Sequence, residues 1–161
     1  MGQLEEAAFS AFYRTHARGL WAYVYRVTGH AADADDIVQE AFLRLLRAGP
    51  GTDKIEQQRR FLYRVASNLM VDRWRTRTHE ADEPHAEPSV APLTPDDDVA
   101  KTFAALSRRE RALLWLAYVE GESHDAIATS LGVGRGSIKV MLFRAKRRLR
   151  DLLTVRGLTR I

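Results

Sequence analysis

The stretch LGVGRGSIKVMLFRAKRRLR, residues 131–150, contains a glycine-spaced turn followed by a segment rich in arginine and lysine. Glycine adopts the left-handed backbone conformation at little cost, so Gly132 is expected to end one short helix before the next begins. Apolar residues then recur every three or four positions, which predicts a long helix with one buried side. These residues are Ile138, Leu142, Ala145, Leu149 and Leu152. A short helix, a tight turn and a long basic helix are typical of a helix-turn-helix.

The residues before this stretch supply start and stop signals for the preceding helices. Ser107 and Glu110 form the S-x-x-E pattern of a capping box, which predicts a helix over RERALLWLAYV (109–119). Gly121 is expected to end that helix, and Ser123 is expected to cap the next short one.

The first half of the chain is also predicted to be helical, because no segment alternates apolar and polar residues as a strand would. One helix is expected over residues 4–28, ended by Gly29. A second begins at DADD (33–36), whose carboxylates favour the positive end of a helix dipole, and a third covers about 57–77. The second helix is expected to bury Ala34, Ile37, Val38, Ala41, Phe42 and Leu45, and the third Phe61, Leu62, Val65, Leu69 and Trp74.

Between these two helical parts lies a segment that cannot form a packed core. Residues 78–98 hold four of the five prolines and seven acidic residues without one base. The predicted fold class is therefore all-α, with helical domains over 1–77 and 99–161 joined by a flexible acidic, proline-rich linker. The second domain carries 13 basic and five acidic side chains. That excess either serves solubility alone or suits a polyanionic partner.

Composition excludes several classes of function. The chain has no cysteine, which removes disulfides, thiol nucleophiles and cysteine-type zinc sites. The N-terminus lacks the features of a signal peptide, and the longest strongly apolar run, 112–119, is too short to span a bilayer, so a cytoplasmic location is expected. The histidines lack metal-ligand spacing, and a helix N-terminus accounts for DADD. We therefore expect no enzyme, no metal and no other cofactor.

One face of the second helix lies opposite its predicted buried side. Asp36, Gln39, Glu40 and Leu43 recur there at i, i+3, i+4 and i+7. Three polar groups around an exposed leucine form either a solvated helix surface or a docking site for a basic partner helix.

The third helix mixes arginines with aromatic residues. Arginine binds phosphates, and aromatic rings stack on the bases of separated strands, although such rings can also belong to a core. Phe61 fits the core interpretation, whereas Tyr63 and Asn68 lie off the predicted buried stripe.

Three segments resemble conserved regions of the extracytoplasmic-function sigma factors, which are small bacterial transcription initiation factors. DADDIVQEAFLRLLRA (33–48) is similar to region 2.2, FLYRVASNLMVDRWR (61–75) to regions 2.3–2.4, and residues 106–153 to region 4. Each motif alone is moderately specific. Their order and spacing, which extend over nearly the whole chain, make the resemblance very specific.

The resemblance implies that the chain binds core RNA polymerase and opens promoters. Asp36, Gln39 and Glu40 match the DxxQE motif that binds the β′ clamp helices, and Leu43 lies beside them. The β flap and an anti-sigma factor are further implied partners. Because no ATP-binding motif is present, promoter opening must use binding energy alone.

The resemblance also implies two sets of promoter-binding residues. The helix over 61–77 and the loop before it, at about 49–57, would read and open the −10 element, and the last helix would read the −35 element. The −10 residues are Arg60, Tyr63, Arg64, Asn68, Asp72, Arg73 and Arg75. The −35 residues are Arg135, Ser137, Lys139, Val140, Phe143, Arg144 and Arg147.

Val140 and Phe143 depart from the family pattern, which usually has polar or basic residues there, and Gly134 replaces the usual capping serine. The two apolar side chains lie one turn apart. They would either contact thymine methyl groups, which we favour slightly, or form an apolar patch for an anti-sigma protein or the flap. The strongest rival function is a stand-alone helix-turn-helix regulator that binds DNA without polymerase.

Overall fold

The computed structural model describes residues 3–48, 54–80 and 98–157. This part of the chain contains helices and no strand, as the sequence predicts. The first three helices are α1 (Gln3–Thr28), α2 (Ala31–Ala48) and α3 (Ile55–Glu80). The others are α4 (Asp98–Ala104), α5 (Arg108–Leu114), a π-helical turn η1 (Trp115–Val119), α6 (His124–Leu131) and α7 (Arg135–Val155). No described helix is long and apolar enough to cross a membrane.

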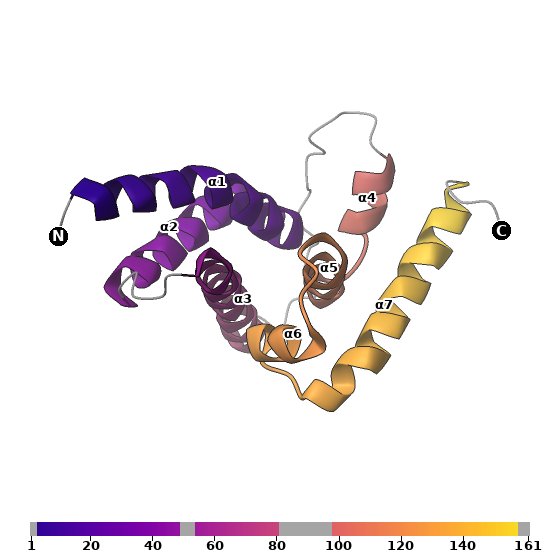
Figure 1. Ribbon diagram of the computed structural model, residues 1–161. Helices are drawn as coiled ribbons and strands as arrows, with labels where there is room; N and C mark the ends of the chain where they lie inside the picture. Colours follow the sequence, from indigo (N-terminus) through magenta and orange to yellow (C-terminus); the bar gives the residue numbers. More distant parts are fainter. Residues whose placement is uncertain (1–2, 49–53, 81–97, 158–161) are drawn as a thin grey trace.

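The α1–α3 helices pack together as a first module (Figure 1). Gly29 ends α1 with a φ of 77°, as predicted. The six apolar residues predicted for the inner side of α2 are all buried, which confirms that stripe. Most of the expected linker and residues 49–53 lie outside the described residues. The α3 helix runs to Glu80, so it includes the first three residues of the segment expected to be linker.

The buried side of α3 differs from the predicted stripe. Leu62 and Val65 are buried as expected, but Phe61, Leu69 and Trp74 are only partly buried. The buried side instead includes Tyr63, Ala66, Ser67, Met70 and Val71. The expectation that Tyr63 lies off the buried side is therefore wrong. The reason is that α3 packs against α1 and α2 on one side and against α6 on another, which widens its buried surface.

Local capping signals place the helices of the second module, α4–α7. Ser107 and Glu110 form the predicted reciprocal capping box, and the Ser123 hydroxyl accepts a hydrogen bond from the Ala126 N–H. Gly121 and Gly132 have φ values of 64° and 66°, which are left-handed conformations that glycine favours. The single helix predicted over 109–119 is wrong in one respect, because it continues from α5 into the π-helical turn.

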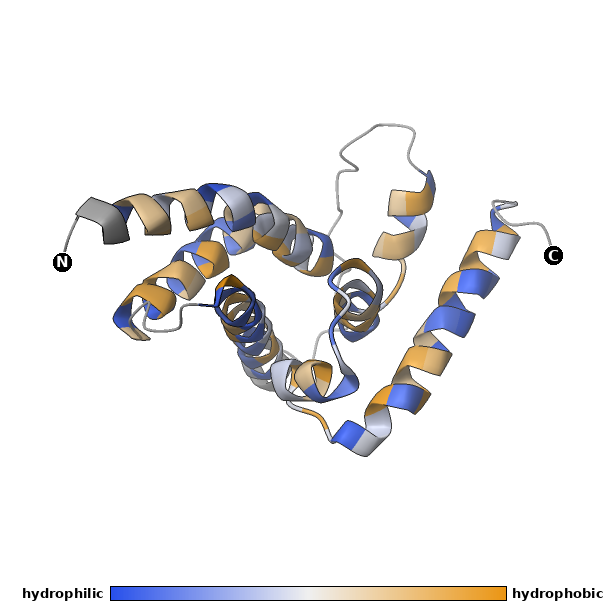
Figure 2. Cartoon of the chain, viewed as in Figure 1, coloured by the Kyte–Doolittle hydropathy of each residue, from blue (hydrophilic) through white to orange (hydrophobic). Residues whose placement is uncertain are grey.

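The α7 helix is attached to the module through its predicted apolar stripe. Ile138, Leu142 and Ala145 are buried, and Leu149 and Leu152 are partly buried against a smaller apolar cluster. Polar and apolar residues follow one another in bands along this helix (Figure 2). Its N-cap, Gly134, makes no side-chain cap hydrogen bond, as expected for glycine.

The two modules pack against each other. The α6 helix lies beside α3, and α5 packs against α1 (Figure 1). Buried residues of both modules, such as Tyr23, Met70, Leu116 and Ile127, belong to one continuous apolar cluster. The protein thus closes around a shared core, an arrangement for which the sequence contains no local signal.

Candidate nucleic-acid and protein interfaces

The outer face of α2 carries the predicted polymerase-binding residues. Asp36, Gln39 and Leu43 are exposed, and Leu43 retains 45% of its accessible surface. Glu40 is half-buried and accepts a hydrogen bond of 3.0 Å from Arg44 Nε. Because the opposite side of α2 is buried, these four side chains form one solvent-facing surface. The structure brings this predicted set together.

The other carboxylates of the DADD stretch have structural partners. The Trp21 indole N–H donates to Asp35 Oδ1 at 2.8 Å, and Arg73 Nη1 donates to Asp33 Oδ1 at 3.1 Å. The second contact ties α3 to the start of α2, so Arg73, a predicted −10 residue, already holds a carboxylate. Within the described residues, no group of three or more histidine, cysteine or acidic side chains has a metal-binding arrangement.

Most predicted −10 residues lie on the surface of α3. Arg60, Arg64, Asn68, Asp72 and Arg75 are exposed, and Arg73 is partly buried. The Arg64 guanidinium lies 5.5 Å from the centre of the Phe61 ring, a cation–π distance that orients both groups. The exposed residues form a polar surface on which a phosphate backbone can be bound.

Tyr63 is separated from that set by its burial. Its ring retains only 4% exposure and lies 5.5 Å from the Tyr23 ring on α1, measured between ring centres. Burial, reinforced by the nearby charge of Glu120, raises the pKa of the Tyr63 hydroxyl. In this arrangement the ring has no open face on which a base can stack.

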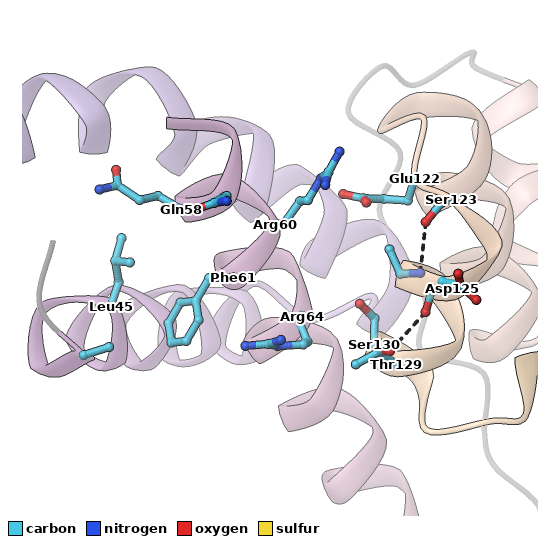
Figure 3. Close-up of a pocket in the computed structure, with 13 residues that line it drawn as sticks. Leu45, Gln58, Arg60, Phe61, Arg64, Glu122, Ser123, Asp125, Thr129 and Ser130 are labelled. Carbon is cyan, nitrogen blue, oxygen red and sulfur yellow. Dashed lines mark hydrogen bonds between the residues drawn. The ribbon is translucent and has the colours of Figure 1, made fainter. Parts of the chain in front are cut away.

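A cavity of about 540 Å³ lies where α2, α3 and α6 meet. Arg60, Phe61 and Arg64 reach it from α3, and Asp125 and Ser130 line it from α6 (Figure 3). Two predicted −10 arginines therefore face the second module across an open space, rather than solvent alone.

The predicted −35 residues form a second surface on α7. All seven are exposed, including Val140 at 49% and Phe143 at 65%. Val140, Phe143, Arg144 and Arg147 follow the i, i+3, i+4, i+7 spacing of one helix face. Arg135, at the start of α7, donates from Nε to Asp125 of α6 at 2.7 Å. The apolar pair thus lies among basic side chains.

Sequence reasoning missed the residues that join the modules. Arg59, on α3, contacts Glu120 at 2.9 Å and Glu122 at 3.1 Å, both from the segment before α6. These partners are 61 and 63 positions away along the chain, so no helical spacing connects them. The sequence showed that these residues carry opposite charges, but not that they meet.

Comparisons with known proteins identify the family of both helical modules. Residues 12–80 match the family model Sigma-70 region 2, and residues 96–149 match Sigma-70, region 4. The chain is 35% identical to the ECF RNA polymerase sigma factor SigL of Mycobacterium tuberculosis, over 97% of this chain and 94% of SigL. It is 26% identical to the ECF RNA polymerase sigma factor SigW of Bacillus subtilis, over 92% of this chain and 90% of SigW.

A solved structure shares the fold. The sigma factor RpoE, in complex with the anti-sigma factor NepR from Bartonella quintana, superposes with a TM-score of 0.66 at 21% identity, over 92% of this chain and 98% of RpoE. The two family models and the near-complete match to SigL also distinguish this chain from a stand-alone regulator, since both sigma regions are present in order. The chain belongs to the extracytoplasmic-function sigma factors of the sigma-70 family.

Proposed function

We propose that this sigma factor docks on core RNA polymerase through the outer face of α2 and reads promoters through α3 and α7. The observation that carries the proposal is the exposed set Asp36, Gln39 and Leu43, on a helix whose other side is buried. A leucine with 45% exposure between acidic and amide side chains suits a partner helix that is both basic and partly apolar. We assign that partner to the β′ clamp helices.

The −10 element is assigned to α3. Arg60, Arg64 and Arg75 are exposed cations that suit the phosphate backbone, and Asn68 offers both a donor and an acceptor to a base edge. Tyr63, which is buried against Tyr23 of α1, is not available to a base in this arrangement. Residues 49–53 of the loop expected to take part lie outside the described residues.

The −35 element is assigned to the exposed face of α7. Arg135, Ser137, Lys139, Arg144 and Arg147 supply charge and hydrogen bonds, as expected of a recognition helix in the major groove. We assign Val140 and Phe143 to thymine methyl groups. The alternative use of this apolar pair is contact with the β flap or with an anti-sigma factor, the kind of partner with which RpoE was crystallised.

The domain organisation completes the proposal. Residues 1–77 act as the polymerase-binding and −10 domain, 78–98 as a linker and 99–161 as the −35 domain, in the cytoplasm. Tethering on polymerase raises the effective concentration of both domains, so two weak DNA contacts act as one selective site. Opening costs a few kcal/mol per unstacked base step, which phosphate contacts and capture of a flipped base offset.

Binding of the purified protein to bacterial core RNA polymerase tests the docking face. We expect Asp36→Arg to abolish the binding seen with the wild type, because reversing this charge places two cations in contact. Asp151→Arg, the same change at an exposed position of α7, should bind normally. Equal binding by the wild type and Asp36→Arg would place the interface elsewhere. Absence of binding by every folded variant would refute the polymerase-dependent function.

A further inference from the structure

The first turn of α7 carries a single long side chain. Arg135, the first residue of this helix, lies between Gly134 and Gly136, and the short side chain of Ser137 follows. A Cβ placed on Gly136 would meet no atom within 4 Å, so the space beside this turn is open. Because the N-terminal residues of a recognition helix contact base edges, Arg135 is the side chain of this turn that reaches furthest into a major groove.

A carboxylate of α6 contacts this arginine. Arg135 Nε lies 2.7 Å from Asp125 Oδ1, and the two side chains retain 77% and 61% exposure. An ion pair as exposed as this one adds little to the stability of the fold. Its consequence is orientation, because the carboxylate contacts the guanidinium at Nε and leaves the two Nη nitrogens to another acceptor.

Asp125 keeps a fixed place beside the start of α7. Ser123 caps α6, and the Thr129 hydroxyl donates to the Asp125 backbone carbonyl at 3.0 Å, so the carboxylate remains for Arg135 (Figure 3). Ile127 of α6 and Ile138 of α7 are both buried in the same apolar cluster. Because this core joins the two helices, the position of the carboxylate relative to α7 is set by the packing of the module.

An acidic side chain in this place is unfavourable for DNA binding in general. Asp125 is the one acidic residue of α6, and the first helix of a helix-turn-helix crosses the DNA backbone. A carboxylate near phosphates weakens the binding of every sequence. Any gain from Asp125 therefore lies in discrimination between sequences rather than in affinity.

We infer that Asp125 is a positioning residue for base recognition, which orients Arg135 so that its Nη nitrogens contact a guanine within the −35 element. Guanine presents two acceptors, O6 and N7, in the major groove, and the edge of a guanidinium binds both. An arginine already held at Nε loses less side-chain freedom when it forms this contact. The inference deepens the proposed −35 role of α7 and rests on it.

Selection of promoter fragments by the polymerase complex tests this assignment. The protein bound to bacterial core RNA polymerase is given fragments randomised over the −35 region, and the bound fragments are sequenced. We expect Arg135→Gln to lower a wild-type preference for guanine at one base pair about fivefold or more. Asp125→Asn should lower the same preference about two- to fivefold, as expected for an exposed ion pair. It should also raise the affinity for fragments that lack this guanine, since a negative charge is removed.

The double variant shows whether Asp125 acts through Arg135. In the Arg135→Gln background, Asp125→Asn should still raise the affinity for all fragments but should leave the base preference unchanged, because the arginine that it orients is absent. A gain in affinity with a loss of preference is the signature of positioning. Local unfolding of α6 would lower both.

Matched controls change the same residue types elsewhere on α7. Asp151→Asn removes an exposed carboxylate, and Arg148→Gln removes an arginine that lies 3.6 Å from Glu110 in the other ion pair between α7 and a neighbouring helix given by the described residues. Both variants should keep the guanine preference. Circular dichroism confirms that each variant remains helical.

The outcomes separate this inference from the function on which it rests. An unchanged base preference in Arg135→Gln or Asp125→Asn overturns the inference, as does an equal loss in the controls. A further loss of preference when Asp125→Asn is added to Arg135→Gln overturns the positioning role. A wild-type complex that selects no base pair over the −35 region would refute the proposed role of α7, and the inference with it.

Discussion

The α3 and α7 helices are both long, basic and assigned to DNA, yet they differ in how much of their surface is available. The α7 helix, 21 residues long, packs on one side and exposes all seven predicted −35 residues. The α3 helix, 26 residues long, packs on two sides and buries Tyr63. The neighbours of α7 leave a whole face of that helix exposed, whereas α3 keeps a narrower exposed face that includes Arg60, Arg64 and Asn68. Two helices of similar composition thus differ in how many of their predicted DNA-binding residues reach the surface: all seven on α7, but not Tyr63 on α3.

The largest expected effect concerns the attachment of α7. Ile138 has no exposed surface and anchors the start of this helix in the shared core. We expect Ile138→Ala to lower the free energy of unfolding by about 2–5 kcal/mol, as large-to-small substitutions in a core do. Val140→Ala, two positions away and half-exposed, should cost no more than about 0.5 kcal/mol. Denaturant unfolding of both variants measures this, and similar losses would show that α7 is not anchored as described.

The second effect concerns the contact between the two modules. We expect Arg59→Ala to destabilise the closed form by about 3 kcal/mol, because two nearly buried carboxylates lose their partner. Arg64→Ala, on the exposed side of the same helix, loses a cation–π contact of at most about 1 kcal/mol. Small-angle scattering should show a larger radius of gyration for Arg59→Ala alone. Equal radii for the two variants would contradict the difference.

The third effect uses pH. Burial raises the pKa of the Tyr63 hydroxyl, so the folded protein keeps this proton while an unfolded chain ionises near pH 10. The stabilisation is therefore complete below about pH 10 and is lost as the pH rises further, by about 1.4 kcal/mol for each pH unit. Unfolding free energies at pH 9 and 11 should show a smaller loss in Tyr63→Phe than in the wild type. Tyr118→Phe, at an exposed position, should behave like the wild type.

The smallest effect concerns base reading by α7. Arg144→Gln should weaken binding to every duplex and reduce the slope of log K against log salt by about 1. Val140→Ser should leave that slope unchanged and reduce the preference for thymine by about 1 kcal/mol. Titration of −35 duplexes with and without thymine, at several salt concentrations, separates the two terms. An unchanged base preference in Val140→Ser would exclude direct readout by this residue.

Local signals predicted a large part of this fold. Helix caps and glycine stops act only on neighbouring residues, so the local sequence is enough to predict where these helices begin and end. Examples are Ser107, Ser123, Gly29, Gly121 and Gly132. The inner side of α2 was predicted for a similar reason, since its apolar residues follow one helical spacing and meet one side of the module. The exposed set on its outer face follows from the same geometry.

The covered side of α3 was not predictable in this way. Tyr63 packs against Tyr23 of α1 and lies beside Glu120 of the second module, and Arg59 contacts Glu120 across 61 positions of the chain. Periodicity reports only which residues share a helix face and cannot reveal a neighbour from a distant segment. The predicted buried stripe of α3 missed Tyr63 and Ser67, which contact Tyr23 of α1, a segment far away along the chain.

The π-helical turn at Trp115–Val119 determines the direction in which the following residues leave the helix. Its closing bond runs from the Glu120 N–H to the Trp115 carbonyl at 3.1 Å, five residues apart rather than four. The turn thus contains one residue more than an α-helical turn, and each residue of an α-helix corresponds to a rotation of about 100°. The side on which Glu120 leaves the helix, and hence whether it can meet Arg59, is set by a single residue of chain length. In a relative with a regular α-helical turn here, a glutamate at the aligned position would leave on a different side, so aligned acidic residues do not imply a shared closure.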